Sequence, residues 1–129
     1  MSVHISSNME DYLETIHLLE QERRTVRVKA IAAEMQITMP SVSSAVKNLE
    51  NQGMVSHSRY DSVELTKEGA QIAEAVYKRH RVIKHFLSKV LGLESDIAEK
   101  DACRIEHNIS EETLNKLIQF LEKIEDSDK

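Results

Sequence analysis

Residues 40–65 read PSVSSAVKNLENQGMVSHSRYDSVEL, and the spacing of the apolar residues changes part-way along this stretch. In the first half the apolar residues recur at helical spacing, which predicts a helix that begins at Pro40 and ends at Gly53. After Gly53 apolar and polar residues alternate, which predicts two short strands over residues 54–59 and 62–65. A helix followed directly by a β-hairpin is typical of a winged helix-turn-helix domain.

Two further apolar stripes precede this stretch, and each predicts an amphipathic helix. The stripes consist of Met9, Tyr12, Leu13, Ile16 and Leu19, and of Val28, Ile31, Ala32 and Met35. Three helices and a hairpin in this order predict a DNA-binding domain over residues 1–70, with the helix from Pro40 as recognition helix and the hairpin as wing. A generic helical bundle that carries a hairpin is the alternative.

The remainder of the chain also shows helical spacing of apolar residues. Thr66 precedes a long connector helix predicted over about residues 67–91, and a shorter helix is expected to run through His107. Ser110 is the expected cap of a last helix, whose stripe consists of Leu114, Leu117, Ile118 and Leu121. The fold class is therefore mainly α, with a helical domain over residues 71–129. The last stripe serves either a dimer surface or the core of one chain.

Composition excludes several classes of protein. The chain has 129 residues, a formal net charge of −5 and one Cys, so a framework of intramolecular disulfides is excluded. We expect a cytoplasmic protein without a membrane segment. No phosphate-binding loop or nucleotide-binding glycine pattern is present, so neither an enzyme nor a small-molecule substrate is expected. The acidic balance means that DNA binding has to use a local patch or a bound cation.

A candidate DNA-reading surface lies on the helix from Pro40. Its expected exposed residues are small, hydroxylated or basic, and the wing adds an arginine: Thr38, Pro40, Ser41, Ser43, Ser44, Lys47 and Arg59. Small hydroxyl residues at a helix N-terminus allow backbone N–H groups and hydroxyls to approach phosphates, and methyl groups can contact thymine. The alternative is that the serines cap the helix and the basic residues belong to a solvated face.

Two groups of residues are candidates for a metal site. Cys103, Glu106 and His107 are spaced i, i+3 and i+4, which places a thiol, a carboxylate and an imidazole on one face of a helix. Asp11 and Glu14 share a face of the first helix by the same rule. A buried structural cysteine, a structural histidine and a solvated acidic pair are the alternatives.

Several strings of the sequence resemble the diphtheria-toxin-repressor and manganese-transport-regulator family over about residues 9–124. The strings are Met9-Glu10-Asp11-Tyr12-Leu13-Glu14-Thr15-Ile16, Pro40-Ser41-Val42-Ser43, Leu65-Thr66-Lys67-Glu68-Gly69, Arg79-His80 and Ala102-Cys103-Arg104-Ile105-Glu106-His107. The chain ends where larger members continue into a barrel domain, so the resemblance implies the short form. Cys103 stands where the manganese branch has Glu. Lys84 and Glu99 stand where the iron branch has Glu and His.

The resemblance implies a homodimeric repressor of manganese or iron uptake genes that binds palindromic double-stranded operator DNA. It places Asp11, Glu14, His80, Cys103, Glu106 and His107 at metal-ligand positions. The expected ion is Mn(II) or Fe(II), with Co(II) or Zn(II) able to bind in vitro. The cation would couple the first helix to the dimerisation domain and set the spacing of the recognition helices at about 34 Å.

Two other functions remain open from the sequence. Cys103 is also compatible with a winged-helix regulator that senses redox state or a small ligand. The other alternative is a helical metal-binding protein that does not bind DNA.

Overall fold

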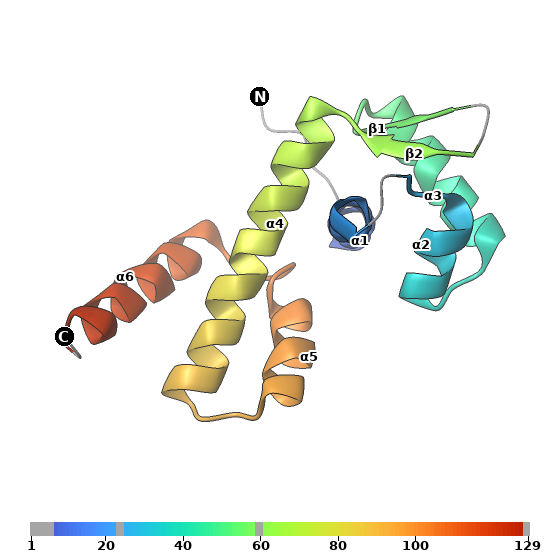
Figure 1. Cartoon of the computed structure of the whole chain (residues 1–129). Helices are drawn as coiled ribbons and strands as arrows, with labels where there is room; N and C mark the ends of the chain where they lie inside the picture. Colours follow the sequence, from blue (N-terminus) through green and yellow to red (C-terminus); the bar gives the residue numbers. More distant parts are fainter. Residues whose placement is uncertain (1–6, 23–24, 59–60, 128–129) are drawn as a thin grey trace. The chain divides into compact units, whose positions relative to one another are not determined.

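The computed structural model describes residues 7–22, 25–58 and 61–127 of the chain. Helices make up most of this part, and a two-stranded antiparallel sheet interrupts them (Figure 1). In chain order the elements are α1 (Ser7–Glu22), α2 (Val28–Met35), α3 (Met39–Asn51), β1 (Val55–His57), β2 (Val63–Leu65), α4 (Lys67–His85), the π-helix η1 (Phe86–Val90), α5 (Ser95–Ile105) and α6 (Glu111–Ser127). The predicted mainly helical class, with a winged helix-turn-helix, is confirmed.

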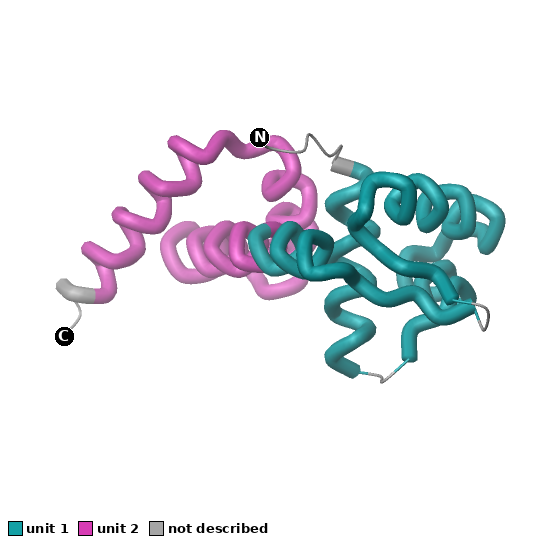
Figure 2. Tube along the Cα trace, turned by 90° about the horizontal axis from the view of Figure 1, so that it is seen from above, with its two compact units in different colours: residues 1–75 teal, residues 76–129 magenta. Residues whose placement is uncertain are grey.

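The chain divides into two compact units, residues 1–75 (unit 1) and residues 76–129 (unit 2), which Figure 2 colours separately. The boundary falls inside α4. Within the described ranges, no helix combines the length and the apolar character that a membrane crossing requires.

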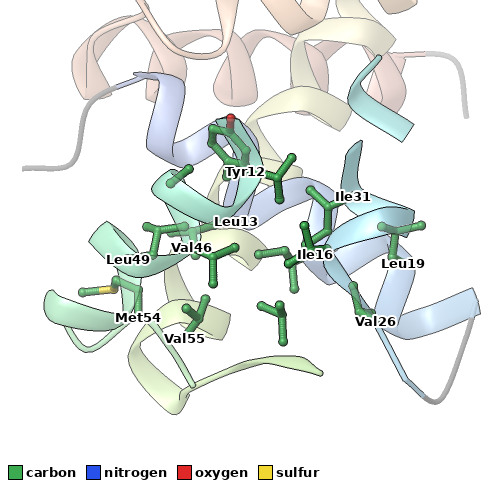
Figure 3. Close-up of a cluster of buried hydrophobic side chains, with 14 of the residues drawn as sticks. Tyr12, Leu13, Ile16, Leu19, Val26, Ile31, Val46, Leu49, Met54 and Val55 are labelled. Carbon is green, nitrogen blue, oxygen red and sulfur yellow. The ribbon is translucent and has the colours of Figure 1, made fainter. Parts of the chain in front are cut away.

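The core of unit 1 is aliphatic and comes from α1, α2, α3 and the hairpin (Figure 3). Leu13 and Ile16 of α1 are fully buried, as are Ile31 of α2 and Val46 of α3. Burial of one such side chain contributes roughly 1.5–3 kcal/mol. The predicted stripes are therefore the faces that pack together, and they fix how α3 is held.

A tight turn joins α2 to α3. Gln36 adopts the left-handed conformation with φ 57°, and the N–H of Ile37 reaches the Ala32 carbonyl oxygen at 3.1 Å. This pattern is a Schellman motif, which ends a helix and reverses the chain. Thr38 then caps α3 by accepting the Ser41 N–H at 3.3 Å, and Pro40 lies in the first turn, where it sacrifices no hydrogen bond. The N-terminal end of α3 is thus defined by local chemistry.

The hairpin pairs Val55 with Leu65 and His57 with Val63. Both strands are shorter than predicted, and Arg59, the predicted DNA contact on the wing, lies outside the described residues. Val63 also donates its N–H to the Val26 carbonyl oxygen at 2.7 Å, so the segment before α2 adds to the edge of the hairpin. Pairing on both edges of β2 therefore fixes the wing within unit 1.

The start of α4 is locked to the hairpin. The Thr66 N–H donates to the Met54 carbonyl oxygen at 3.0 Å, and the Thr66 hydroxyl accepts the Gly69 N–H at 3.1 Å, as expected for a cap. A Cβ added at Gly69 would lie 1.9 Å from the Met54 carbonyl oxygen. Position 69 is therefore restricted to glycine by the close approach of the β1 entry to α4.

Unit 2 has a smaller apolar cluster, in which Ile83 and Leu87 pack with Ala98 and Ala102 of α5. The connector helix does not stay α-helical to its end. Residues 86–90 form the π turn η1, in which the Leu91 N–H donates to the Phe86 carbonyl oxygen at 3.3 Å. Gly92, with φ 73°, then ends the helix in the left-handed conformation that favours glycine.

The predicted helix through His107 ends two residues early. α5 stops at Ile105, and the Asn108 N–H turns back to the Ile105 carbonyl oxygen at 2.9 Å. Ser110 caps α6 as expected, since its hydroxyl accepts the Thr113 N–H at 3.1 Å. Leu114 and Leu121 of the last stripe are buried within the single chain, so these two residues serve an intrachain core.

Candidate metal centre

Three predicted ligands converge in unit 2. His80 lies on α4 with 8% of its side chain exposed. Its Nδ1 lies 3.3 Å from Glu106 Oε1 and 3.7 Å from Cys103 Sγ. An imidazole nitrogen, a carboxylate oxygen and a sulfur, all metal-ligand atoms, therefore meet at one side of the His80 ring.

The end of α5 explains this convergence. Cys103 lies in the last turn of the helix, and Glu106 is the C-cap residue. Glu106 retains right-handed helical dihedral angles, and its N–H donates to the Ala102 carbonyl oxygen at 2.9 Å. Residues three apart on a helix share a face, so Cys103 and Glu106 project together although the regular helix stops at Ile105.

Glu106 is the most unusual residue of the cluster. Its side chain is fully buried, and none of the described residues offers a hydrogen bond to its Oε2. A buried charged oxygen without a partner is costly, because the carboxylate loses its water without compensation. A divalent cation next to Oε2, Cys103 and His80 would supply the missing partner, so the residues present fit a metal ion.

His107 lies beside this group. Its Nε2 is 3.9 Å from Glu106 Oε1, and its side chain is 10% exposed. It follows the C-cap in a turn and not within the helix, which corrects the prediction that all three residues of the Cys-Arg-Ile-Glu-His string lie on one helix. The turn nevertheless keeps the imidazole next to the Glu106 carboxylate.

The other ring nitrogen of His80 has a different environment. Its Nε2 lies 2.9 Å from Glu99 Oε1, and Glu99 Oε2 lies 2.9 Å from Lys84 Nζ. The predicted ligand set omitted Glu99. The sequence could have indicated Glu99, because it stands four residues before Cys103 and so shares a face of α5 with it. Its ion pair with Lys84 could not be predicted, because it depends on how α4 and α5 pack together.

The charges around the ring change its protonation. The contact with Cys103 and the hydrogen bond with Glu106 raise the pKa of His80 to about 11, in spite of burial, which favours the neutral ring; Glu99 adds to the increase. Burial opposes ionisation of Glu99, but hydrogen bonds from Lys84 and His80 lower its pKa below the usual value. Without a cation, both ring nitrogens of His80 therefore carry hydrogen, and the site holds protons where a metal would bind.

Asp11 and Glu14 lie in unit 1, on α1. Their spacing of three residues places them on one face, as predicted, and Glu14 is buried. The Asp11 carbonyl oxygen accepts the Thr15 hydroxyl at 2.9 Å, which is an ordinary intrahelical bond. The two carboxylates form an acidic pair on the first helix of the DNA-binding unit.

The predicted DNA-reading residues lie along the outer side of α3 and at its cap. Thr38, Pro40, Ser41, Ser43, Ser44 and Lys47 are all exposed. Val42, Ala45, Val46 and Leu49 point into the core from the opposite side. Thr38 and Ser41 also bond to each other, with their hydroxyl oxygens 2.8 Å apart, so they have a capping role as well. The exposed side of α3 is free of acidic residues from Met39 to Asn48.

Two family models together cover most of the chain. The iron dependent repressor N-terminal DNA binding domain matches residues 4–63. The iron dependent repressor metal binding and dimerisation domain matches residues 66–128. The chain belongs to the iron-dependent repressor family. It is therefore related to metal-responsive transcriptional repressors, and the family's metal-binding domain contains the cluster around His80.

Individual relatives agree with this family. An uncharacterized HTH-type transcriptional regulator of Methanocaldococcus jannaschii is 34% identical, over 95% of this chain and 98% of that protein. The diphtheria toxin repressor of Corynebacterium glutamicum is 35% identical, over 89% of this chain and 50% of that protein. The structure of the manganese regulator SloR is 31% identical with a TM-score of 0.79, over 93% of this chain and 55% of that chain. The chain thus spans nearly the whole of the first relative and about half of the other two.

Proposed function

We propose that this protein is a homodimeric repressor of manganese or iron uptake genes, which binds a palindromic operator when it holds Mn(II) or Fe(II). The observation that supports this proposal most strongly is the buried Glu106 carboxylate, whose Oε2 has no hydrogen-bond partner among the described residues. The proposed ligands are Asp11, Glu14, His80, Cys103, Glu106 and His107. Family membership supports a divalent metal, and the choice of ion rests on the donor set.

The donor set of unit 2 mixes soft and hard groups. The Cys103 thiolate favours Fe(II), Co(II) or Zn(II), whereas the Glu106 carboxylate suits Mn(II) as well. His80 contributes Nδ1, which must release its proton before it can bind a cation. The bound cation supplies positive charge that offsets the carboxylates. Coordination number, and not raw affinity, would have to select Mn(II), since Mn(II) ranks last in affinity at a given site.

Asp11 and Glu14 are proposed as further ligands because they belong to the family-like string at the start of the chain. With them the ligand set draws on both units, so cation binding and the arrangement of the DNA-binding unit are linked. A metal-loaded dimer would hold its two recognition helices about 34 Å apart, which matches successive major grooves. Linkage requires that operator DNA tightens cation binding by the same factor.

The exposed side of α3 is the proposed reading surface. Ser41, Ser43 and Ser44 are small enough for close approach to phosphates, and Lys47 adds positive charge one turn later. Within Met39–Asn51, no Arg lies in the first turn to read guanine, so DNA shape and methyl contacts would carry much of the specificity.

Exposed apolar side chains of unit 2 support the homodimer. Ile97, Ile105 and Phe120 are each more than a third exposed, and Phe120 packs its ring edge-on against Phe86 with centroids 6.1 Å apart. Apolar groups of this size on a small unit favour association with a second copy.

An anaerobic operator titration tests the proposal. A duplex is first selected from a random pool by the protein with Mn(II), and its binding is then followed by fluorescence anisotropy with Mn(II), Fe(II), Co(II), Zn(II) or chelator. We expect tight binding only with metal, and loss of binding in Ser44→Glu at unchanged metal affinity, because a carboxylate there faces phosphate. Ser95→Glu, which adds the same charge in unit 2, is the control. Equal binding with and without chelator would contradict the proposal.

One observation favours a second function. Cys103 is exposed, so an oxidant can reach its Sγ, which lies 3.7 Å from the His80 ring. A redox-sensing regulator would lose operator binding with hydrogen peroxide and regain it with thiol, irrespective of chelator. A metal-activated regulator would respond to the chelator first.

A further inference from the structure

The two carboxylates that flank His80 are not equivalent. Glu99 has both oxygens engaged, with Oε1 2.9 Å from His80 Nε2 and Oε2 2.9 Å from Lys84 Nζ. Glu106 has one oxygen near His80 Nδ1 and a second oxygen with no partner in the described part of the chain. The ring therefore separates a satisfied carboxylate from an unsatisfied one.

We propose that Lys84 and Glu99 are positioning residues, which fix His80 as an Nδ1 ligand of the unit 2 cluster. Glu99 holds Nε2–H and stays outside the set of atoms bound to the metal. This inference rests on the proposed metal site at Glu106, and it assigns roles to two residues that the predicted ligand set did not include.

The ring geometry supports the role of Glu99. A metal-binding histidine uses one ring nitrogen for the ion and donates its other N–H to a carboxylate or carbonyl, which fixes the tautomer and the ring orientation. Glu99 is the carboxylate on the Nε2 side, whereas Cys103 and Glu106 both lie on the Nδ1 side. The proton that leaves is therefore the one at Nδ1, and the proton at Nε2 remains in the bond to Glu99.

The Lys84 ammonium holds Glu99 in this position. Lys84 stands one turn after His80 on α4, and its Nζ lies 2.9 Å from Glu99 Oε2. His80, Glu99 and Cys103 offer ligand atoms that lie within 4.8 Å of one another. Of these residues, Cys103 faces Nδ1 with Glu106, whereas Glu99 faces Nε2. The ion pair with Lys84 thus keeps the Glu99 carboxylate on the Nε2 side of the ring.

Exposure makes the pair suitable for mutation. The side chains of Lys84 and Glu99 are 37% and 47% exposed. Ion pairs of this exposure contribute little to folding. Variants of either residue are therefore expected to fold. A change in their metal affinity then reflects the position of the His80 ring and the charge beside it, and not a loss of folding.

The experiment measures anaerobic Co(II) binding by calorimetry and by the absorption of the Co(II)–thiolate bond, in wild type, Lys84→Gln, Lys84→Arg and Glu99→Ala. Lys100→Gln, an exposed neighbour on α5, is the control. We expect wild-type Co(II) affinity for Lys84→Arg and the control. Glu99→Ala should bind Co(II) with about tenfold to hundredfold lower affinity, and Lys84→Gln, in which Glu99 loses its ion pair, should lie between it and wild type.

A second readout identifies the bound nitrogen. With 15N-labelled histidine and Zn(II), NMR should show Nδ1 of His80 bound to metal and Nε2 protonated. Zinc on Nε2, or an unchanged affinity in Glu99→Ala or in Lys84→Gln, would each overturn the inference while leaving the metal site in place. Failure of wild type to bind Co(II), Zn(II) or Mn(II) would instead refute the proposed function on which it rests.

Discussion

In unit 1 the buried side chains of α1, α2, α3 and the hairpin form one mainly aliphatic cluster, and Glu14 is a buried charged residue of α1, whereas in unit 2 the buried positions include the charged pair His80 and Glu106. The apolar cluster of unit 2 is small and consists of Ile83, Leu87, Ala98 and Ala102 with partly buried neighbours. Unit 1 is thus stabilised mainly by apolar packing, while unit 2 contains a buried carboxylate oxygen without a hydrogen-bond partner among the described residues. Mutations in the apolar core of unit 1 should therefore change stability, and mutations at the proposed ligands should change metal binding.

The largest effect on metal binding is expected for Glu106→Ala. Glu106 is a proposed ligand, and loss of a group that only supports a ligand already costs about tenfold to a hundredfold in metal affinity. We therefore expect Mn(II) and Co(II) affinity to fall by roughly a hundredfold or more, and metal-activated operator binding to be lost. Calorimetry measures the affinity, and circular dichroism checks that the helices remain. Glu122→Ala, an exposed carboxylate on α6, is the control.

His107→Ala should give a loss in the same direction, because its imidazole lies beside Glu106. If either variant responded to metal like wild type, the metal centre would have to lie elsewhere in the chain.

Gly69→Ala is expected to lower the stability of the fold and to leave the metal affinity unchanged. The new Cβ would lie 1.9 Å from the Met54 carbonyl oxygen, so the start of α4 or the entry to β1 must move. Overpacking of this kind costs about 1–3 kcal/mol. Urea denaturation should show this loss, with Co(II) affinity unchanged below the transition. Glu68→Ala, in the same turn but exposed, should unfold like wild type, and a wild-type stability for Gly69→Ala would show that the backbone yields there without cost.

Cys103→Glu should change which metal ion the site prefers. A carboxylate can bind through both oxygens and suits a hard ion with a high coordination number, whereas a thiolate favours softer ions. We expect the ratio of Mn(II) to Zn(II) affinity to rise by about tenfold. Cys103→Ser, which keeps the size of the side chain, should weaken Zn(II) without gaining Mn(II). A variant that unfolds early and is not stabilised by Mn(II) would remove Cys103 from the ligands.

The most gradual effect, which is spread over several pH units, is a pH dependence of the metal-free protein. The pKa of His80 is about 11 in the folded chain against an ordinary 6.5, so between these values the folded state binds more protons than the unfolded state. The unfolding free energy should therefore decrease as pH rises through this window, by less than about 1.4 kcal/mol per pH unit, and stay level below it. Thermal unfolding in the presence of chelator measures the slope, which His80→Gln should lack. The same proton must leave on metal binding, so Mn(II) affinity should rise with pH.

The fold of unit 1 could be predicted because its signals are local. Helical spacing, the proline at the start of α3, the glycine after it and the alternation in the hairpin are all visible in a single stretch of sequence. The early end of α5 and the π turn were not predicted. Leu87 of η1 and Ala102 of α5 belong to the same apolar cluster, a tertiary contact that the local spacing does not show. Element boundaries are therefore where tertiary contacts outweigh local preference.

The candidate site was only partly predictable for a similar reason. Spacing placed Cys103 beside Glu106, and the family-like strings added His80. The bond between Glu99 and Lys84 joins residues on two helices, and nothing in the spacing of either helix requires it. Packing likewise decides that Nδ1 of His80 faces Glu106 and that Nε2 faces Glu99. The different environments of these two carboxylates are therefore visible only in the structure.

The π turn η1 has a consequence for insertions and deletions. A π turn holds one residue more than the α turn that it replaces. Removal of one residue from Phe86–Val90 would therefore allow the α geometry to continue to the end of the helix, with the earlier residues unchanged. A deletion within Lys67–His85 has no extra residue to remove and would rotate the rest of that helix by about 100°. Chain length should therefore be less restricted in η1 than in α4, which carries His80.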